Sequence, residues 1–288
     1  MMITALHVNS TLPFRTRHKG RKYEIDNFEI LTTILSALTW RRYNGSIKLY
    51  TDSVALEVYD TFKLLDLWDA GIDTETLDHV VEDINPHIFW ASSKLLALRK
   101  EPAPIALLDT DLIVWEPITD VLQTVEISVL HREQLYPGTY IAPQFLKIRE
   151  GYQFDPEWDW EEYPCNTAFV YLADQDFKEY YTSCAIDFMT GNHELPKELV
   201  TQMVFAEQRM LAMCAKKQMF PIHHFLEDPY QRENTIFTHI WGGKSIARAH
   251  DSQNTLLCTA LLNKIEKLFP DYYDKIKESG LVHKILLQ

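Results

Sequence analysis

The strongest constraint on the fold is an alternation of short apolar segments with longer helical patterns through the first half of the chain. Such an alternation is typical of parallel strands joined by helical crossovers. The sequence therefore predicts an α/β fold with a mostly parallel central sheet flanked by helices. The predicted strands are residues 3–8, 47–51 and 77–81, and the predicted helices begin at Asp26 or Asn27, at Ser53 and at Asn85.

The second half is less regular but contains the same kinds of segment. Strand-like stretches cover residues 125–130, 167–172, 219–223 and 236–241, and helical patterns cover 176–189, 197–217 and 255–277. No repeat or linker interrupts the chain. We expect one catalytic α/β domain over residues 1–250, with residues 251–288 as a helical C-terminal extension packed on it.

Composition narrows the class of protein. The chain has 288 residues, 46% of them hydrophobic, and a formal net charge of -13, which argues against a nucleic-acid partner. No secretory leader and no stretch of transmembrane length is evident. Four cysteines lie far apart without C-x-x-C spacing. These features predict a cytoplasmic protein with no integral membrane segment, and leave peripheral attachment to the inner membrane open.

An acidic pair interrupts the most apolar strand, residues 104–114, as IALLDTDLIV. Buried carboxylates are costly unless they are paired or coordinate a metal. Asp109 and Asp111 point the same way if the backbone stays extended, and ligands of open α/β sheets gather at the carboxyl ends of strands. The pair predicts a site for Mg²⁺ or Mn²⁺ bridging a diphosphate, with a solvated acidic turn as the alternative.

Two motifs carry a family resemblance. LLDTDLIVWEPI resembles the Asp-x-Asp strand of GT-A glycosyltransferases, and THIWGGK resembles the late His-x-x-Gly-x-x-Lys segment of their retaining branch, typified by glycogenin and lipopolysaccharide galactosyltransferases. This resemblance implies a single GT-A domain, His239 as third metal ligand, and Gly242, Gly243 and Lys244 near the diphosphate. Lys244 comes one residue early, and the Pro-Trp that often follows is lacking. The imidazole favours Mn²⁺ over Mg²⁺.

Further site residues follow from the same resemblance. PCNTAFVYL places Asn166 beside the donor sugar, and AEQRML places Glu207 and Gln208 near the reacting centre. Plainer interpretations are a turn for Asn166 and a solvated helix face for Glu207. The remaining donor-binding candidates are Lys94 for a phosphate or ribose, and His7, Asn9 and Asp52 for the base or ribose, with helix capping as the alternative for Asp52.

The resulting hypothesis is a retaining, metal-dependent glycosyltransferase. It takes a nucleoside diphosphate sugar, by resemblance a UDP-sugar, and transfers the sugar to a glycan or lipid-linked acceptor. One alternative is a phosphatase of the haloacid dehalogenase type, in which Asp-x-Asp supplies the nucleophile and the acid/base, although that pair normally ends the first strand. Another is a catalytically silent GT-A-like module that binds carbohydrate or assists assembly.

Overall fold

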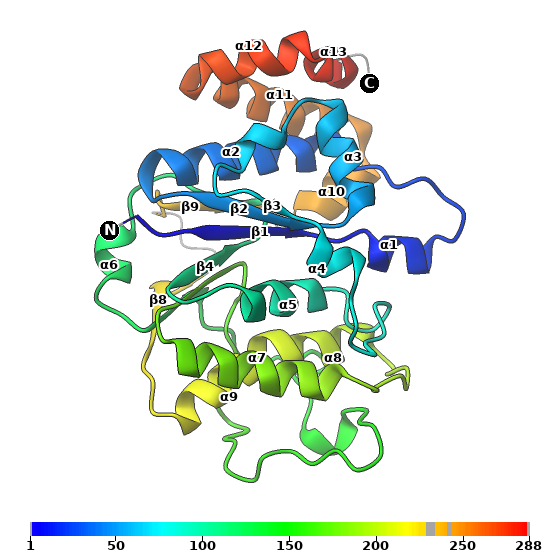
Figure 1. Ribbon diagram of the computed structural model, residues 1–288, viewed down its shortest axis with the longest axis vertical. Coiled ribbons are helices and arrows are strands. Elements are labelled where there is room, and N and C mark those ends of the chain that lie inside the picture. The colour runs from blue at the N-terminus through cyan, green and yellow to red at the C-terminus, as the bar shows by residue number, and fades with distance from the viewer. Residues whose placement is uncertain (1, 229–233, 241–242, 287–288) are drawn as a thin grey trace.

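The computed structural model describes residues 2–228, 234–240 and 243–286 as a mixed α/β structure (Figure 1). The strands are β1 (Ala5–Asn9), β2 (Ile47–Thr51), β3 (Ile72–Asp73), β4 (Ile105–Leu108), β5 (Leu112–Val114), β6 (Ile127–His131), β7 (Phe169–Leu172), β8 (Ile222–Leu226) and β9 (Phe237–His239). The longer helices are α2 (Asn27–Tyr43), α3 (Ser53–Thr61), α5 (Ser92–Lys100), α7 (Gln175–Met189), α9 (Met210–Lys217), α11 (Asp251–Leu268) and α12 (Pro270–Glu278). Shorter ones are α1 (Leu12–Arg17), α4 (Glu75–Asp78), α6 (Thr119–Leu122), α8 (Leu199–Val204), α10 (Gly243–Ala249) and α13 (Leu281–Leu286).

Within the described ranges, seven strands form one sheet in the order β3-β2-β1-β4-β7-β6-β8. β7 is antiparallel to both of its neighbours, and the other pairings are parallel. In register, Ala5 of β1 faces Ile47 of β2 on one side and Ala106 of β4 on the other. The predicted α/β class, with a mostly parallel central sheet flanked by helices, is confirmed.

Helices cover both faces of the sheet, with α2 and α11 on one face and α5, α7 and α9 on the other (Figure 1). Each face has its own buried cluster: Ile34 and Trp40 of α2 belong to one, and Leu95 and Tyr181 of α5 and α7 to the other. Strands buried on both faces read as continuous apolar runs, as IALL does in β4.

Three local predictions are corrected by the structure. The helix predicted to begin at Asn85 begins at Ser92, as α5. Residues 77–81 form no strand. Instead, the third strand is β3, which ends at Asp73, and α4 follows it. The Asp73 carboxylate accepts the amide of Thr76, in the first turn of α4, at 2.9 Å. The helix after β2 is capped by Asp52, whose side chain accepts the amide of Ala55, and not by Ser53.

The C-terminal helices lie over α2, on the side of that helix remote from the sheet (Figure 1). Arg42 of α2 donates to the carbonyl of Leu268, and Lys275 of α12 pairs with Asp66. Leu261, Leu262 and Ile265 of α11 join the core cluster of the α2 face. None of the described helices is long and apolar enough to cross a membrane.

Candidate metal and donor site

The sequence predicted that the acidic pair lies on one continuous strand. In the structure the pair lies on a tight turn instead. β4 ends at Leu108, the amide of Leu112 donates to the carbonyl of Asp109 at 2.9 Å, and the chain then enters β5. Asp109 stays attached to the main sheet through its amide, which donates to the carbonyl of Ala168 at 2.8 Å. Asp109 therefore follows β4 and Asp111 precedes β5, and the turn keeps both carboxylates at the carboxyl end of β4.

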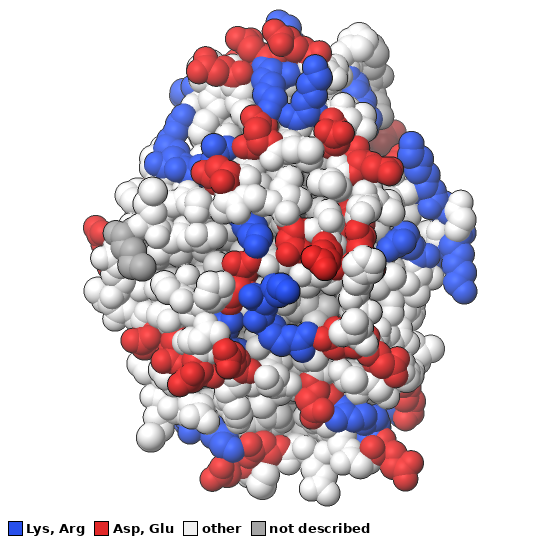
Figure 2. Space-filling model, in the orientation of Figure 1, with Lys and Arg blue, Asp and Glu red and all other residues white. Residues whose placement is uncertain are grey.

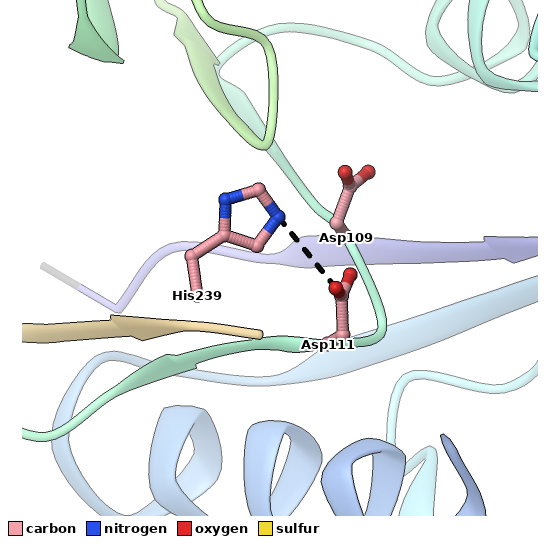
Figure 3. A group of neighbouring side chains, drawn as sticks. All are labelled: Asp109, Asp111 and His239. Carbon is pink, nitrogen blue, oxygen red and sulfur yellow. Dashed lines mark ion pairs between the residues drawn. The ribbon is translucent and has the colours of Figure 1, made fainter. Parts of the chain in front are cut away.

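His239 reaches the acidic pair because β5 pairs with β9 in antiparallel fashion. Leu112 stands opposite His239, and the amide of Ile240 donates to the carbonyl of Asp111 at 3.2 Å. One ligand atom from each of Asp109, Asp111 and His239 lies within 4.8 Å of the other two (Figure 3). Two carboxylates and one imidazole form a donor set that suits a divalent cation such as Mn²⁺.

Asp111 is the most buried member of this cluster. It is 2% exposed, and within the described ranges its Oδ2 accepts no hydrogen bond of ordinary geometry. Its partners are the Lys244 ammonium, 3.0 Å from that oxygen, and His239 Nε2 at 3.6 Å. A buried carboxylate is costly unless cations compensate its charge. Faced by one ammonium and one imidazole, this oxygen is the feature of the site that fits a bound metal best.

The imidazole is held in its neutral form. Burial lowers the pKa of His239 below its usual value, and this effect outweighs the nearby charges of Asp111 and Asp109. A neutral imidazole has a nitrogen lone pair to offer to a cation. The electrostatics of the cluster therefore favour coordination over an ion pair between His239 and Asp111.

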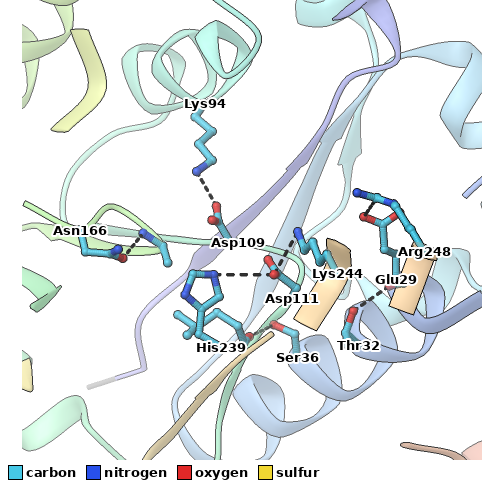
Figure 4. A network of polar contacts seen from close by, with 12 residues as sticks. Glu29, Thr32, Ser36, Lys94, Asp109, Asp111, Asn166, His239, Lys244 and Arg248 are labelled. Atoms are coloured by element: carbon cyan, nitrogen blue, oxygen red, sulfur yellow. Dashed lines mark hydrogen bonds and ion pairs between the residues drawn. The ribbon is translucent and has the colours of Figure 1, made fainter. Parts of the chain in front are cut away.

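Lys94 joins the cluster to a further carboxylate, that of Glu207. Its Nζ, presented by α5, lies 2.5 Å from Asp109 Oδ1 (Figure 4). The same Nζ lies 2.9 Å from Glu207 Oε1. Burial by itself lowers the pKa of Lys94, but the charges of Asp109 and Glu207 together raise it above its ordinary value. Lys94 is therefore a permanent cation beside the Asp-x-Asp turn.

Glu207 and Gln208 lie on a π-helical turn, Phe205–Arg209, between α8 and α9. Such turns are rare in proteins, and those that do occur are often found at functional sites. The extra residue changes the direction of the neighbouring side chains. Glu207 is 6% exposed and so does not lie on a solvated face. Gln208 accepts a hydrogen bond from the Tyr140 hydroxyl at 2.6 Å. Glu207 thus joins the acidic pair through Lys94, whereas the side chain of Gln208 bonds Tyr140 instead.

Asn166 precedes β7 and shares its amide between two partners. Its Nδ2 donates to Glu133 Oε1 at 3.0 Å, and its Oδ1 accepts the backbone amide of Ala168 at 3.1 Å. Glu133 and the buried His131, whose Nε2 lies 3.7 Å from Glu133, were not predicted from the sequence. Both follow the strand predicted over 125–130, so the same argument from polar residues at a strand end could have found them.

His7, Asn9 and Asp52 are occupied by protein partners. The Trp68 indole donates to His7 Nδ1 at 3.3 Å, so His7 Nε2 donates to Ser36 at 2.9 Å. Asn9 bonds the hydroxyls of Tyr59 and Tyr23. Asp52 is fully buried and accepts the amides of Thr11 and Ala55 in addition to the Thr11 hydroxyl. The side-chain groups of these three residues therefore hold strand ends and helix starts together.

The glycines and the lysine that follow His239 are only partly covered by the structure. Gly242 lies outside the described residues, whereas Gly243 begins α10. Lys244 follows in the first turn of that helix and directs its ammonium to Asp111, as given above. Of the predicted site residues, those brought around the Asp-x-Asp turn are Lys94, Asp109, Asp111, Glu207, His239 and Lys244.

Comparisons with known proteins give one family match and several structural likenesses. A family model described as "Family of unknown function (DUF6734)" matches residues 15–279. No curated protein matches the sequence. Solved structures with similar coordinates include mouse xyloside xylosyltransferase 1 in its apo form, at 15% identity over 78% of this chain and 85% of that one, with a TM-score of 0.40. The PaToxG glycosyltransferase is 12% identical over 96% and 87%, with a TM-score of 0.42. A nucleoside-diphosphate-sugar pyrophosphorylase from Vibrio cholerae is 13% identical over 78% and 92%, with a TM-score of 0.41.

Proposed function

The chain belongs to the family described as a family of unknown function, DUF6734, and we propose that it is a metal-dependent glycosyltransferase. Its substrate in this proposal is a nucleoside diphosphate sugar, and its acceptor is a glycan or a lipid-linked molecule. The observation that carries the proposal is the convergence of Asp109, Asp111 and His239 on one point, with a buried Asp111 oxygen that lacks a hydrogen bond among the described residues.

These three side chains would hold a divalent cation, Mn²⁺ or Mg²⁺. A cation bound there would offset the negative charge that develops on a departing diphosphate. The protein's own contribution is the fixed position of the ligands: the turn between β4 and β5 sets the carboxylates, and the pairing of β5 with β9 sets the imidazole. Pre-set ligands need no reorganisation when charge develops, which is where electrostatic catalysis gains most.

Two ammonium groups stand beside the proposed metal site. Lys94 contacts Asp109, and Lys244 contacts Asp111. In the proposal these lysines bind the oxygens of the diphosphate, and the backbone of Gly242 and Gly243 borders the same group. Lysine acts at such a place as a compact, mobile point charge. Lys94 also positions Glu207, since it contacts both carboxylates.

Glu207, Gln208 and Asn166 are proposed to face the donor sugar. Carboxylate and amide oxygens stabilise the positive charge of an oxocarbenium-like centre. Retention of the anomeric configuration, a UDP-sugar donor and a cytoplasmic location are proposed from the motif resemblance. So is the division into a catalytic unit over residues 1–250 and an extension over residues 251–288.

The phosphatase alternative finds no specific support in this topology. Its Asp-x-Asp pair ends the first strand of the chain, whereas here β1, β2 and β3 all precede the pair in sequence. Among the described residues, Asp109 is also held by Lys94 at 2.5 Å. A nucleophilic carboxylate would have to give up this ion pair to attack a phosphorus atom.

The test is hydrolysis of a panel of nucleoside diphosphate sugars, with nucleoside diphosphate release as the readout. We expect release with Mn²⁺ for at least one donor, none with EDTA, and a fall of about 100-fold in Glu207→Gln. The matched control is Asp176→Asn, an exposed acid on α7. Release of inorganic phosphate from a phosphomonoester, with no donor bound at any metal concentration, would overturn the proposal.

A further inference from the structure

Residues 15–22, which we name the basic loop, read RTRHKGRK and contain five of the chain's Lys and Arg residues. This concentration contrasts with a chain whose formal net charge is -13. The five cationic side chains are Arg15, Arg17, Lys19, Arg21 and Lys22, and all five residues are exposed. The basic loop is thus a local positive surface on an acidic protein.

The charges of the basic loop are not neutralised by the described part of the chain. Arg15, Lys19, Arg21 and Lys22 form no ion pair with any described carboxylate, whereas exposed cations elsewhere do: Arg248 pairs with Asp26 and Glu29. Arg17, in contrast, has partners that carry no charge. Its guanidinium donates to the carbonyl of His87 at 3.0 Å and lies 5.4 Å from the centroid of the Trp90 ring.

The basic loop projects from the body of the molecule. Figure 1 shows α1 and the following connection extending beyond the edge of the sheet, and Figure 2 shows Lys and Arg side chains gathered along that edge. The Arg21 amide donates to the His18 carbonyl, and Gly20 at φ +79° completes the turn. Phe14 and Tyr23 close the base of the loop with an edge contact at 5.3 Å. A loop that projects in this way presents its charges to a broad surface.

The basic loop lies at the same edge of the sheet as the candidate metal site. His7 of β1 pairs with Leu108 of β4, so Asp109 follows β4 at the level where β1 runs out toward α1. Arg17 ties the loop to His87 and Trp90, just ahead of α5, which carries Lys94. A partner held against the basic loop is therefore close to the rim of the proposed transferase site.

We propose that the basic loop docks the protein on a membrane surface that carries anionic phospholipid headgroups. Clusters of four to eight Lys and Arg residues bind such surfaces through the potential of the headgroups, and the effect decays within a Debye length. A nucleic acid fits less well, because its affinity depends on many phosphate contacts over an extended basic face, and the chain is acidic elsewhere. Combined with the proposed transferase activity, this orientation presents the site to a lipid-linked acceptor, a step that rests on the proposed function.

The experiment is co-sedimentation of the full chain with two kinds of vesicle, phosphatidylcholine alone and phosphatidylcholine mixed with phosphatidylglycerol. We expect binding only to the mixed vesicles, weakening as salt is raised. The test variant combines Arg15→Gln, Lys19→Gln, Arg21→Gln and Lys22→Gln, and spares Arg17 because of its contacts. At about 1 kcal/mol for each of the four charges, it should bind the mixed vesicles about 1,000-fold more weakly. The matched control combines Lys63→Gln, Lys197→Gln, Lys267→Gln and Lys277→Gln, which removes four exposed charges from four separate places.

Each outcome bears on the proposal. Equal binding to neutral vesicles, or an equal loss in the control variant, overturns it, and so does tight binding to double-stranded DNA that the test variant alone loses. Competition by millimolar inorganic phosphate would assign the loop to free phosphate and also overturn it. The thermal shift of each variant with Mn²⁺ and UDP is measured in parallel. A retained shift with lost vesicle binding separates the docking surface from the transferase site and shows that the variant folds.

Discussion

Asp111→Asn tests the metal site most directly, because it removes one negative charge and almost no volume. Asp111 is 2% exposed, and its Oδ2 faces the Lys244 ammonium at 3.0 Å and His239 Nε2 at 3.6 Å. An amide in the same place keeps the shape of the side chain but offers a neutral oxygen, which binds a hard divalent cation weakly. The variant should therefore fold and lose most of its affinity for Mn²⁺.

The expected size of the effect follows from ligand linkage. Metal at about 100 times its dissociation constant stabilises the native state by about 2.7 kcal/mol. For a chain of 288 residues this corresponds to a rise in Tm of about 5 °C, taking the range of a large domain. If the loss of one of three ligands weakens binding about 100-fold, the same metal concentration equals the new dissociation constant. The stabilisation then falls to about 0.4 kcal/mol, or roughly 1 °C.

The assay is a thermal melt of each protein with and without Mn²⁺, with each variant compared to its own metal-free midpoint. Asp120→Asn is the matched control, since Asp120 is an exposed acid on α6 away from the cluster. The control should keep the full metal-dependent rise. An Asp111→Asn protein that melts with the same rise as the unaltered chain would falsify the assignment of Asp111 as a ligand.

Three further predictions concern the scaffold, and each is read by urea unfolding. Gly45→Ala should destabilise by about 3 kcal/mol or more, because a Cβ there would lie 2.2 Å from the Ile3 carbonyl oxygen, whereas Gly71→Ala meets no atom within 4 Å and should cost about 1 kcal/mol. Lys178→Met should destabilise by about 2–3 kcal/mol, because the buried Lys178 ammonium satisfies the carbonyls of Leu98 and Glu101 at the end of α5. Burial lowers the pKa of His7 to about 3, so between pH 6.5 and 5 the unfolded chain binds a proton at His7 that the native state does not bind. The free energy of unfolding should therefore fall by about 2 kcal/mol over that range. His7→Gln should abolish this part of the pH dependence.

The parts of the fold that depend on local pattern could be predicted from the sequence. α2 begins at Asn27 and β2 covers 47–51, as the apolar periodicity and the Asn44-Gly45 break indicated. The segment over 77–81 is apolar enough for a strand but too short to decide by periodicity. In the structure its first two residues end α4, where the Asp73 side chain accepts the amide of Thr76, and the rest is irregular. A two-residue strand such as β3 has no pattern of its own to detect.

The candidate site divides in the same way. The acids of the Asp-x-Asp segment were identifiable because charge inside an apolar run is conspicuous. The break between β4 and β5 was not, since it depends on the partner that β5 finds, and that partner is β9, more than 120 residues later in the chain. His7 and Asp52 illustrate the opposite case. Each stands at a strand end, where ligands gather, yet each is saturated by protein groups that only the tertiary structure brings close.

The balance of charge around the turn explains why a cation and a diphosphate would bind together. Asp109, Asp111 and Glu207 contribute three negative charges, and Lys94 and Lys244 contribute two positive ones, while His239 is neutral because burial lowers its pKa. The cluster therefore carries one net negative charge. A divalent cation changes the local sum from one negative to one positive charge. Only then does the site attract an anion, so binding of a nucleoside diphosphate should depend on the metal, whereas a site built from the lysines alone would bind it in EDTA equally well.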